Sequence, residues 1–458
     1  MKFQHTILTY FVLAALAGIS CKKLIGIPPN PPTQLPQSQL FNDSTDIMSA
    51  IAGVYMNFKV TTGNGTNIFG GMQTQYLGCA SDELSNSYGN TFMTNTYIAT
   101  DGTAGSFWSS AYQNIYYVNA CLTGIGATHA IGDSLKQALL GELKVVRAMN
   151  YFYLVNLYNE VPIVTSTDFN ANANLPRSSV DSVYGLIISD LTDARKVLKA
   201  SYPSAGTARP NLYTADALLA RVYLYRKQYA QADAMASEVI GSHLYSLPAL
   251  KSVFSQGSSE AIWQIPAVGG SGRNQTAEAF AFVPSSVYSA PQWQVTTYLL
   301  DSMESTDQRK AAWVGSLTVS GKTYQYPAKY KNRTDTATPA EGYVMFRLAE
   351  QYLIRAEALA QQGKTDSALY DLNAVRNRAG LPNSTAVTSE DIQNAVMHER
   401  QIEFFIEWGH RWFDLRRTGQ LNAVIGKIKT GWNPAAATLP VPASERQNDP
   451  YLSQNPGY

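Results

Sequence analysis

The chain has 458 residues, which is long enough to bury a large core in one elaborated domain or two interleaved lobes. Its formal net charge is +1 and 15% of its residues are charged, so the composition gives no basic surface that would predict nucleic acid or another polyanion as a partner. The 28 tyrosines and 7 tryptophans stand out. Because a buried tyrosine hydroxyl needs a hydrogen-bond partner, this excess favours a surface that stacks against neutral polar ligands.

The N-terminus predicts export. Lys2 gives a basic start, and the apolar run 7–17 is too short for a membrane-spanning helix, which needs roughly 20 residues. Small residues precede Cys21, as at a lipoprotein processing site where the thiol is acylated. We therefore expect a signal peptide at 1–20 and a lipid anchor on Cys21, with an ordinary signal and a chance cysteine as the alternative.

A proline-rich segment follows the anchor. Residues 21–40 include Pro28-Pro29 and Pro31-Pro32 and little periodic apolar content, which predicts an extended, semi-rigid tether. The folded body is then expected at 41–458. Within it Cys79 and Cys121 are the two remaining cysteines, and they either pair or stay free.

The body begins with a predicted helix that carries apolar residues from Ile47 to Phe58 and is capped by Asn42 or Ser44. Residues 61–105 then lose the helical pattern. A long irregular segment inside a compact protein is usually functional, so 61–105 is predicted to form one part of a loop-rich lobe. Helical spacing returns at 108–122.

Helix pairs follow. Residues 139–157 and 180–198 are predicted to form two amphipathic helices that pack together. Residues 215–240 and 345–378 each resemble a tetratricopeptide hairpin, with short polar turns at 227–228 and 362–364 and an alanine-rich packing face. We therefore expect a mainly α fold, in which hairpins at about 139–240 and 344–420 form the scaffold.

The second part of the predicted lobe is 242–343. It contains few strand-like pieces, at 261–265 and 323–326, together with several aromatic residues. The glycines at 269–272 do not match a phosphate-binding loop and are interpreted as a turn. Binding residues concentrate in such irregular segments, so the lobe is where a ligand is expected.

The densest motif is 398–417, in a helix that Ser389 is predicted to cap. Glu399, Glu403 and Glu407 fall four residues apart, which favours a buried ion-pair lattice with Arg400, Arg411, Arg416 and arginines of neighbouring helices. Paired catalytic carboxylates, as in glycoside hydrolysis, would face each other across a cleft instead. A metal site on His398 and His410 lacks the usual helical spacing of metal-binding histidines.

No phosphate loop, nucleophile elbow or zinc motif is present in the sequence. We therefore expect no enzyme activity, no metal and no cofactor. Three tryptophans within helical periodicity, Trp108, Trp408 and Trp412, are assigned to the core.

The chain resembles the SusD/RagB family of outer-membrane nutrient-uptake lipoproteins. The resemblance covers nearly the whole chain, and its most specific parts are Glu399-Arg400-x2-Glu403 and the run from Arg411 to Arg417. It is also carried by Cys21 with its signal, Trp108-x2-Ala111-Tyr112, Glu142-x4-Arg147-Ala148, Arg347 to Ala358, Leu439 to Pro442 and Gln454 to Tyr458.

This resemblance implies a surface lipoprotein that captures an oligosaccharide and passes it, uncleaved, to a SusC-type TonB-dependent outer-membrane barrel over which it sits as a lid. Relatives include peptide importers, so peptide cargo stays open, as does a plain protein–protein scaffold. Lys22-Lys23 stand where surface-exposed members often carry acidic residues. This departure concerns transfer to the outer leaflet and leaves the predicted attachment unchanged.

Ligand-contact candidates are polar and aromatic residues of the two irregular segments, because sugar rings present apolar faces to aromatic rings and hydroxyls to polar groups. The candidates are Asp82, Asn86, Tyr88, Phe92, Arg273, Tyr288 and Trp293.

Overall fold

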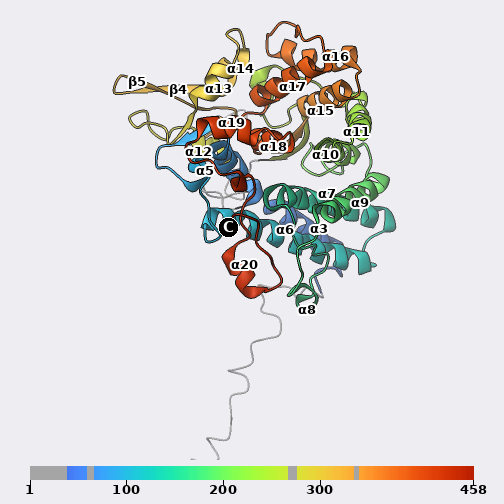
Figure 1. Ribbon diagram of the computed structural model, residues 1–458. Coiled ribbons are helices and arrows are strands. Elements are labelled where there is room, and N and C mark those ends of the chain that lie inside the picture. Colours follow the sequence, from blue (N-terminus) through green and yellow to red (C-terminus); the bar gives the residue numbers. More distant parts are fainter. Residues whose placement is uncertain (1–38, 59–66, 267–275, 335–339) are drawn as a thin grey trace, which may run out of the picture.

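The computed structural model describes residues 39–58, 67–266, 276–334 and 340–458. Long helices occupy one side of the molecule, and the short strands and loops gather on the other (Figure 1). The predicted mainly α fold with few short strands is confirmed. Within the described ranges, no helix is both long and apolar enough to span a bilayer.

The scaffold is a row of helices, each packed against the next. It consists of α6 (Gly102–Ala127), α7 (Asp133–Tyr158), α9 (Val180–Val197), α10 (Leu212–Tyr225), α11 (Tyr229–Gly241), α15 (Leu348–Gln361), α16 (Thr365–Arg378) and α17 (Ser389–Glu403). Helix α7 packs between α6 and α9, α10 between α9 and α11, and α15 contacts α11, α16 and α17. Neighbours in sequence are thus mostly neighbours in space, as the hairpin prediction required.

Small residues and left-handed turns explain the hairpins. Ala220, Ala232 and Ala358 are fully buried where α10, α11 and α15 meet, so these helices approach closely. The turns contain Lys227 (φ 57°) and Gly363 (φ 74°), whose left-handed backbone ends the first helix of each pair. Both predicted turns are confirmed.

The observed cap of the first described helix, α3 (Ser44–Met56), lies one residue away from either predicted cap. Its N-cap is Asp43, whose carboxylate accepts the backbone N–H groups of Thr45 at 2.7 Å and Asp46 at 3.3 Å. An aspartate caps well because its negative charge also faces the positive end of the helix dipole.

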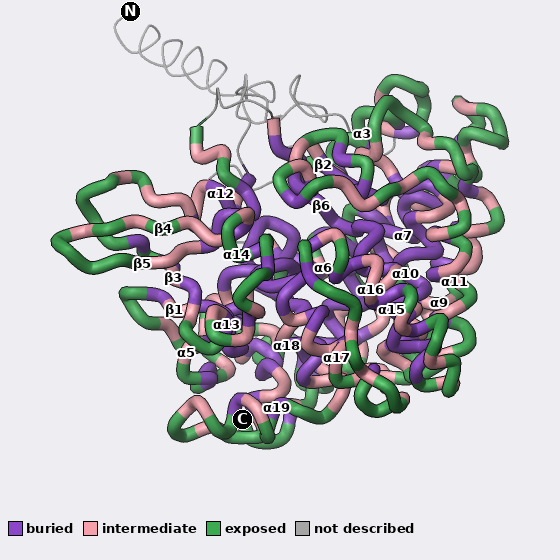
Figure 2. The backbone as a smooth tube through the Cα atoms, turned by 90° about the horizontal axis from the view of Figure 1, so that it is seen from above, coloured by how far each residue is buried: buried purple, intermediate pink, exposed green. Residues whose placement is uncertain are grey.

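The remaining elements are short. They are η1 (Ile68–Leu77), α4 (Gly78–Ala80), β1 (Leu84–Asn86), α5 (Thr91–Thr94), α8 (Phe169–Asn172), η2 (Leu250–Ser252), β2 (Ala261–Pro266), α12 (Ala277–Phe282), β3 (Trp293–Val295), α13 (Thr297–Ser302), α14 (Gln308–Trp313), β4 (Val314–Val319), β5 (Lys322–Pro327), β6 (Gly342–Arg347), α18 (His410–Arg417), α19 (Leu421–Ile428), η3 (Pro434–Ala437) and α20 (Ala443–Asn448). The strands form two-stranded antiparallel pairs, β1–β3, β2–β6 and β4–β5. The β4–β5 hairpin projects from the body in both views (Figures 1 and 2).

Buried residues run through the middle of the molecule and beneath the strands (Figure 2). Trp108, Trp408 and Trp412 are all buried, as predicted. Cys79 and Cys121 are both buried and both free, so they do not pair.

Many tyrosines also belong to the core, which corrects the prediction that their excess reflects a ligand surface. The hydroxyls of Tyr112 and Tyr151 donate to the backbone carbonyls of Pro162 and Val164 at 2.8 and 2.9 Å. These bonds remove the cost of burying a hydroxyl. Composition alone therefore does not identify the surface tyrosines.

Candidate functional site

The candidate site is built on the β1–β3 ribbon, which joins the two irregular segments. Its register sets Leu84 opposite Val295 and Asn86 opposite Trp293. Pairing continues one step further, where the backbone N–H of Ser87 donates to the carbonyl of Gln292 at 2.9 Å. At this end of the ribbon, Tyr88 follows the end of β1, and the segment 285–292 leads into β3.

Asn86 shapes the turn that presents Tyr88. Its side-chain carbonyl accepts the backbone N–H of Tyr88 at 2.9 Å, and its backbone carbonyl accepts that of Gly89 at 3.0 Å. Gly89 has φ 71°, a left-handed conformation that glycine adopts without steric cost. Asn86 itself is buried, so it acts as a turn residue, and Tyr88 is left 83% exposed.

Tyr288 is exposed on the opposing segment. The hydroxyl of Ser286 accepts its backbone N–H at 3.1 Å, and the side chain is 87% exposed. Tyr88 and Tyr288 are the two most exposed large apolar or aromatic side chains of the described residues. We call these two tyrosines, at the same end of the ribbon, the ribbon tip.

Two predicted aromatic contacts lie instead beneath the ribbon. Phe92 is fully buried and packs against Tyr76 and Tyr97, with ring centroids 5.3 and 4.9 Å apart. Trp293 is 5% exposed and makes edge contacts with Tyr76 and Phe282 at 6.2 and 6.1 Å. Because neighbouring rings cover both side chains, they support the tip and offer no open face to a ligand.

Asp82 joins the base of the ribbon to the scaffold. Its two carboxylate oxygens accept from Nε and Nη2 of Arg411 at 2.9 and 2.7 Å, a bidentate pair in which both side chains are largely buried. Its backbone carbonyl also accepts the hydroxyl of Thr296, directly after β3. Asp82 is thus a positioning residue, already saturated by its partners.

Two further ionisable groups, Glu83 and Lys429, lie under the ribbon, and no sequence motif marks either of them. Burial and the neighbouring Asp82 carboxylate raise the pKa of Glu83 to about 8. Lys429, on the segment after α19, donates to the backbone carbonyls of Cys79, Ala80 and Phe92 at 2.5, 2.7 and 3.4 Å, and burial lowers its pKa to about 7. Lys429 therefore fixes both ends of the segment that carries Tyr88.

The remaining ligand candidate, Arg273, lies outside the described residues, as do the glycines at 269–272.

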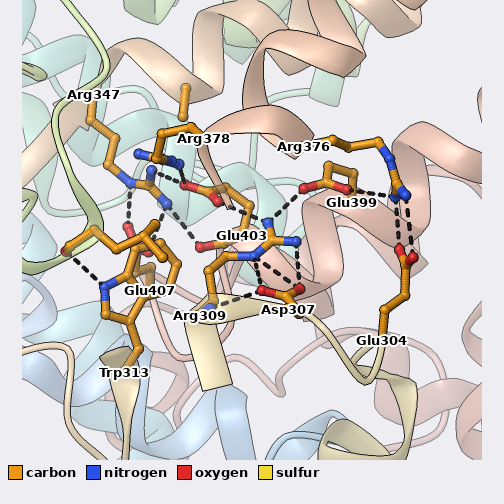
Figure 3. A network of polar contacts seen from close by, with 12 residues as sticks. Glu304, Asp307, Arg309, Trp313, Arg347, Arg376, Arg378, Glu399, Glu403 and Glu407 are labelled. Carbon is orange, nitrogen blue, oxygen red and sulfur yellow. Dashed lines mark hydrogen bonds and ion pairs between the residues drawn. The ribbon is translucent and has the colours of Figure 1, made fainter. Parts of the chain in front are cut away.

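The glutamate motif forms the buried ion-pair lattice that the sequence predicted (Figure 3). Arg309 Nη1 donates to Glu399 at 2.6 Å and to Glu403 at 2.9 Å, and the side chains of all three are at most 1% exposed. Arg347 joins Glu403 at 2.5 Å to Glu407 at 2.9 Å. The lattice also contains Glu260, Glu304, Asp307, Lys329, Arg376 and Arg378.

The predicted partners within the motif were wrong. Arg400 pairs with Asp414, Arg411 with Asp82, and Arg416 with the side chain of Asn159. The helix is also shorter than predicted, because α17 ends at Glu403 and left-handed residues follow it, at Ile406 and Trp408. Glu407 therefore reaches the lattice from a turn.

The cap of α17 is Thr388 rather than Ser389. Its hydroxyl accepts the backbone N–H of Asp391 at 3.1 Å, and Asp391 accepts the N–H of Thr388 in return at 3.1 Å. This reciprocal pair is a capping box.

The lattice brings six carboxylates together with five cations. Burial acts to raise the pKa of Glu403, but Arg378, Arg347 and Arg309 hold it well below its usual range. Each carboxylate here is matched by a cation within hydrogen-bonding distance, which is typical of a structural network. In the described part of the chain, no group of His, Cys, Asp and Glu is placed to hold a metal ion.

The fold and the ribbon together define a class of protein, a scaffold of helical hairpins that supports an irregular lobe with exposed aromatics. Family comparison agrees with it. Residues 267–458 match the model described as the SusD family, and residues 33–224 match the one described as starch-binding associating with outer membrane. The chain belongs to the SusD/RagB family, as its sequence motifs predicted.

Individual relatives cover nearly the whole chain. SusD-like protein P2 of Formosa agariphila is 25% identical, with 98% of this chain and 99% of the relative aligned. A laminarin-binding SusD-like protein has 26% identity and a TM-score of 0.76, covering 91% of this chain and 100% of its own. A SusD superfamily protein from Bacteroides vulgatus superposes with a TM-score of 0.79 at 18% identity over 92% of this chain and 100% of its own, which shows the common fold.

Proposed function

We propose that this chain is a cell-surface binding lipoprotein that captures an oligosaccharide at the ribbon tip and delivers it, without catalysis, to a SusC-type TonB-dependent outer-membrane barrel. The observation that carries the proposal is the exposure of Tyr88 and Tyr288 at one end of a ribbon whose base is buried. Holding aromatic rings open to water has a free-energy cost, so a pair kept open on a fixed support favours a ligand-binding role.

The chemistry of the tip suits a sugar. A tyrosine ring stacks against the apolar C–H face of a pyranose, and its hydroxyl bonds to a ring hydroxyl. The exposed side chains of Ser87, Ser289 and Gln292 beside the tip add neutral hydrogen-bonding groups. The laminarin-binding relative supports the same ligand class.

The membrane part of the proposal rests on Cys21. Acylation of this thiol would anchor the body through the tether 21–40, and the family description supports association with the outer membrane. Replacement of Cys21 by alanine should abolish labelling of the cellular protein with palmitate. Labelling that persists would contradict the anchor.

The binding test uses isothermal titration with glycan and peptide pools. The double variant Tyr88→Ala/Tyr288→Ala should weaken binding of the captured glycan at least tenfold, which is about 1.4 kcal/mol. The matched control is Phe169→Ala/Tyr370→Ala, which removes two other aromatic rings that are 79% and 72% exposed, away from the ribbon. The control should bind like the natural chain.

The rival functions predict other outcomes. Binding of peptides and of no glycan would replace the saccharide by peptide cargo. A protein–protein scaffold predicts that the loop aromatics are buried in the free protein, which holds for Phe92 and Trp293 and does not hold for the ribbon tip. Unchanged glycan affinity in the double variant would refute the proposed site.

A further inference from the structure

A second concave site lies on the scaffold, away from the ribbon tip. It is a cavity of about 400 Å³ where the turn between α10 and α11 meets the end of α15 and one side of α17, α18 and α19. This size lies within the range of small-ligand pockets, which is roughly 300–1,000 Å³.

Side-chain amides surround this cavity. Four carboxamides line it, from Gln361, Gln393, Asn394 and Gln420. Gln361, Asn394 and Gln420 are exposed and Gln393 is half-buried, and among the described residues none of the four side chains is bonded to another residue, so all four amides are open to solvent. By contrast, the amide of the neighbouring Gln362 donates to the carbonyl of Ala358 at 3.0 Å. We call this cavity the carboxamide pocket.

The floor of the pocket is rigid and its charge is compensated. Arg417 donates to both oxygens of Glu357 at 2.5 and 2.7 Å and to Asp414 at 2.8 Å. The side chains of Arg417 and Glu357 are 8% and 6% exposed, so the pair is fixed by packing as well as by its hydrogen bonds. A floor without excess charge favours a neutral ligand.

Apolar groups complete the lining. Val424 and Met397 contribute half-buried apolar surface, and the Met397 thioether lies 3.7 Å from Arg417 Nη2. Leu224 and Leu415 line the cavity as buried side chains, and Tyr229 contributes a half-exposed ring. The pocket thus combines an aromatic ring, aliphatic patches and uncharged amides. Charged ligands find no unpaired counter-charge here except Lys227 at the rim.

We propose that the carboxamide pocket is a second binding site for a short segment of neutral saccharide. A carboxamide presents a donor and an acceptor side by side, and a sugar hydroxyl needs both. The proposal takes its ligand class from the proposed function but uses none of the residues of the ribbon tip. Arg411 connects the two sites, because it lines the pocket and also binds Asp82 under the ribbon.

Two methionines allow the sites to be observed separately by methyl NMR of the full chain. Met397 lines the pocket, and Met93 lies under the ribbon, where its sulfur accepts the backbone N–H of Asn86 at 3.2 Å. The two signals are assigned with Met397→Leu and Met93→Leu. The probes are short laminarin- and starch-derived oligosaccharides, with peptide pools as the rival ligand.

A saccharide that occupies the pocket should shift the Met397 signal with saturation. In the variant Asn394→Ala/Gln420→Ala, the saccharide concentration that half-saturates the Met397 shift should rise at least tenfold, because two amide contacts are lost. The control Gln137→Ala removes an exposed carboxamide on α7, outside the pocket. It should leave the concentration dependence of the Met397 shift unchanged. Binding at the pocket should persist in Tyr88→Ala/Tyr288→Ala.

The outcomes separate this inference from the proposed function. A glycan that shifts Met93 and leaves Met397 unmoved overturns the second site and leaves the ribbon tip intact. A glycan that shifts Met397 alone supports the pocket and overturns the tip. Peptides that shift the Met397 signal where glycans do not would overturn the assignment of the pocket to saccharide. So would the same half-saturating concentration in Asn394→Ala/Gln420→Ala and in the control Gln137→Ala.

Discussion

Glu403 gives the sharpest test of the ion-pair lattice. Its carboxylate accepts from Arg309 at 2.9 Å, from Arg347 at 2.5 Å and from Arg378, and it is fully buried. Glu403→Gln keeps the side-chain volume but removes the charge that three guanidinium groups share. Breaking a buried pair by removing one partner costs about 3–5 kcal/mol, because the remaining charge stays buried without compensation.

We therefore expect the free energy of unfolding in urea to fall by about 3–5 kcal/mol in Glu403→Gln. The control is Asp181→Asn, which breaks the ion pair between Asp181 and Arg226. The Asp181 side chain is 80% exposed. That pair should contribute no more than about 1 kcal/mol. Similar losses in the two variants would refute the idea that burial makes this lattice energetically different from a surface pair.

The same variant tests the exclusion of catalysis. Folded Glu403→Gln should bind glycan like the natural chain, since the lattice does not touch the ribbon tip. Reproducible glycan turnover by the natural protein that Glu403→Gln abolishes would make this carboxylate catalytic and overturn its structural role.

Two further predictions concern the pH dependence of stability and a close approach in the core. Glu83 stays protonated up to about pH 8 when folded but ionises near 4.5 when unfolded, so the free energy of unfolding should fall as pH rises between these values. Urea titrations should show that Glu83→Gln gains stability relative to the natural chain over this range, and a constant difference would contradict the buried neutral carboxyl. Gly124→Ala on α6 would place a Cβ 2.1 Å from the ring of Phe41 and should cost about 1–3 kcal/mol in the same assay, whereas Gly126→Ala, with nothing within 4 Å, should be neutral or stabilising. Equal effects of the two glycine variants would show that Phe41 does not pack there.

Local patterns predicted the scaffold well because helices and short turns depend on nearby residues. The hairpin turns fall at Lys227 and Gly363 as predicted, since their left-handed backbone is a local event. The caps of α3 and α17 were each missed by one residue, at Asp43 and Thr388, because adjacent polar side chains compete for the same backbone N–H groups.

The partners within the lattice depended on information that a local pattern lacks. The spacing of the glutamates correctly indicated buried charges. It did not indicate that Arg309, which lies 90 residues from Glu399 in sequence, would be their partner. Ion pairs form between segments that the fold brings together, so only residue types, and not pairings, could be read from the motif.

At the candidate site, too, a local sequence pattern does not predict which aromatic side chains are exposed. Tyr88 and Phe92 lie four residues apart in one irregular segment, yet one is 83% exposed and the other is fully buried. The difference comes from the turn at Asn86 and from the one-turn helix α5, which directs Phe92 inward against Tyr97. The segment that carries the exposed Tyr88 is held in place by Lys429 and Arg411, which are more than 300 residues away in sequence. Because these two contacts join the Tyr88 segment to the scaffold, loosening either one should disturb the ribbon tip before it unfolds the helices.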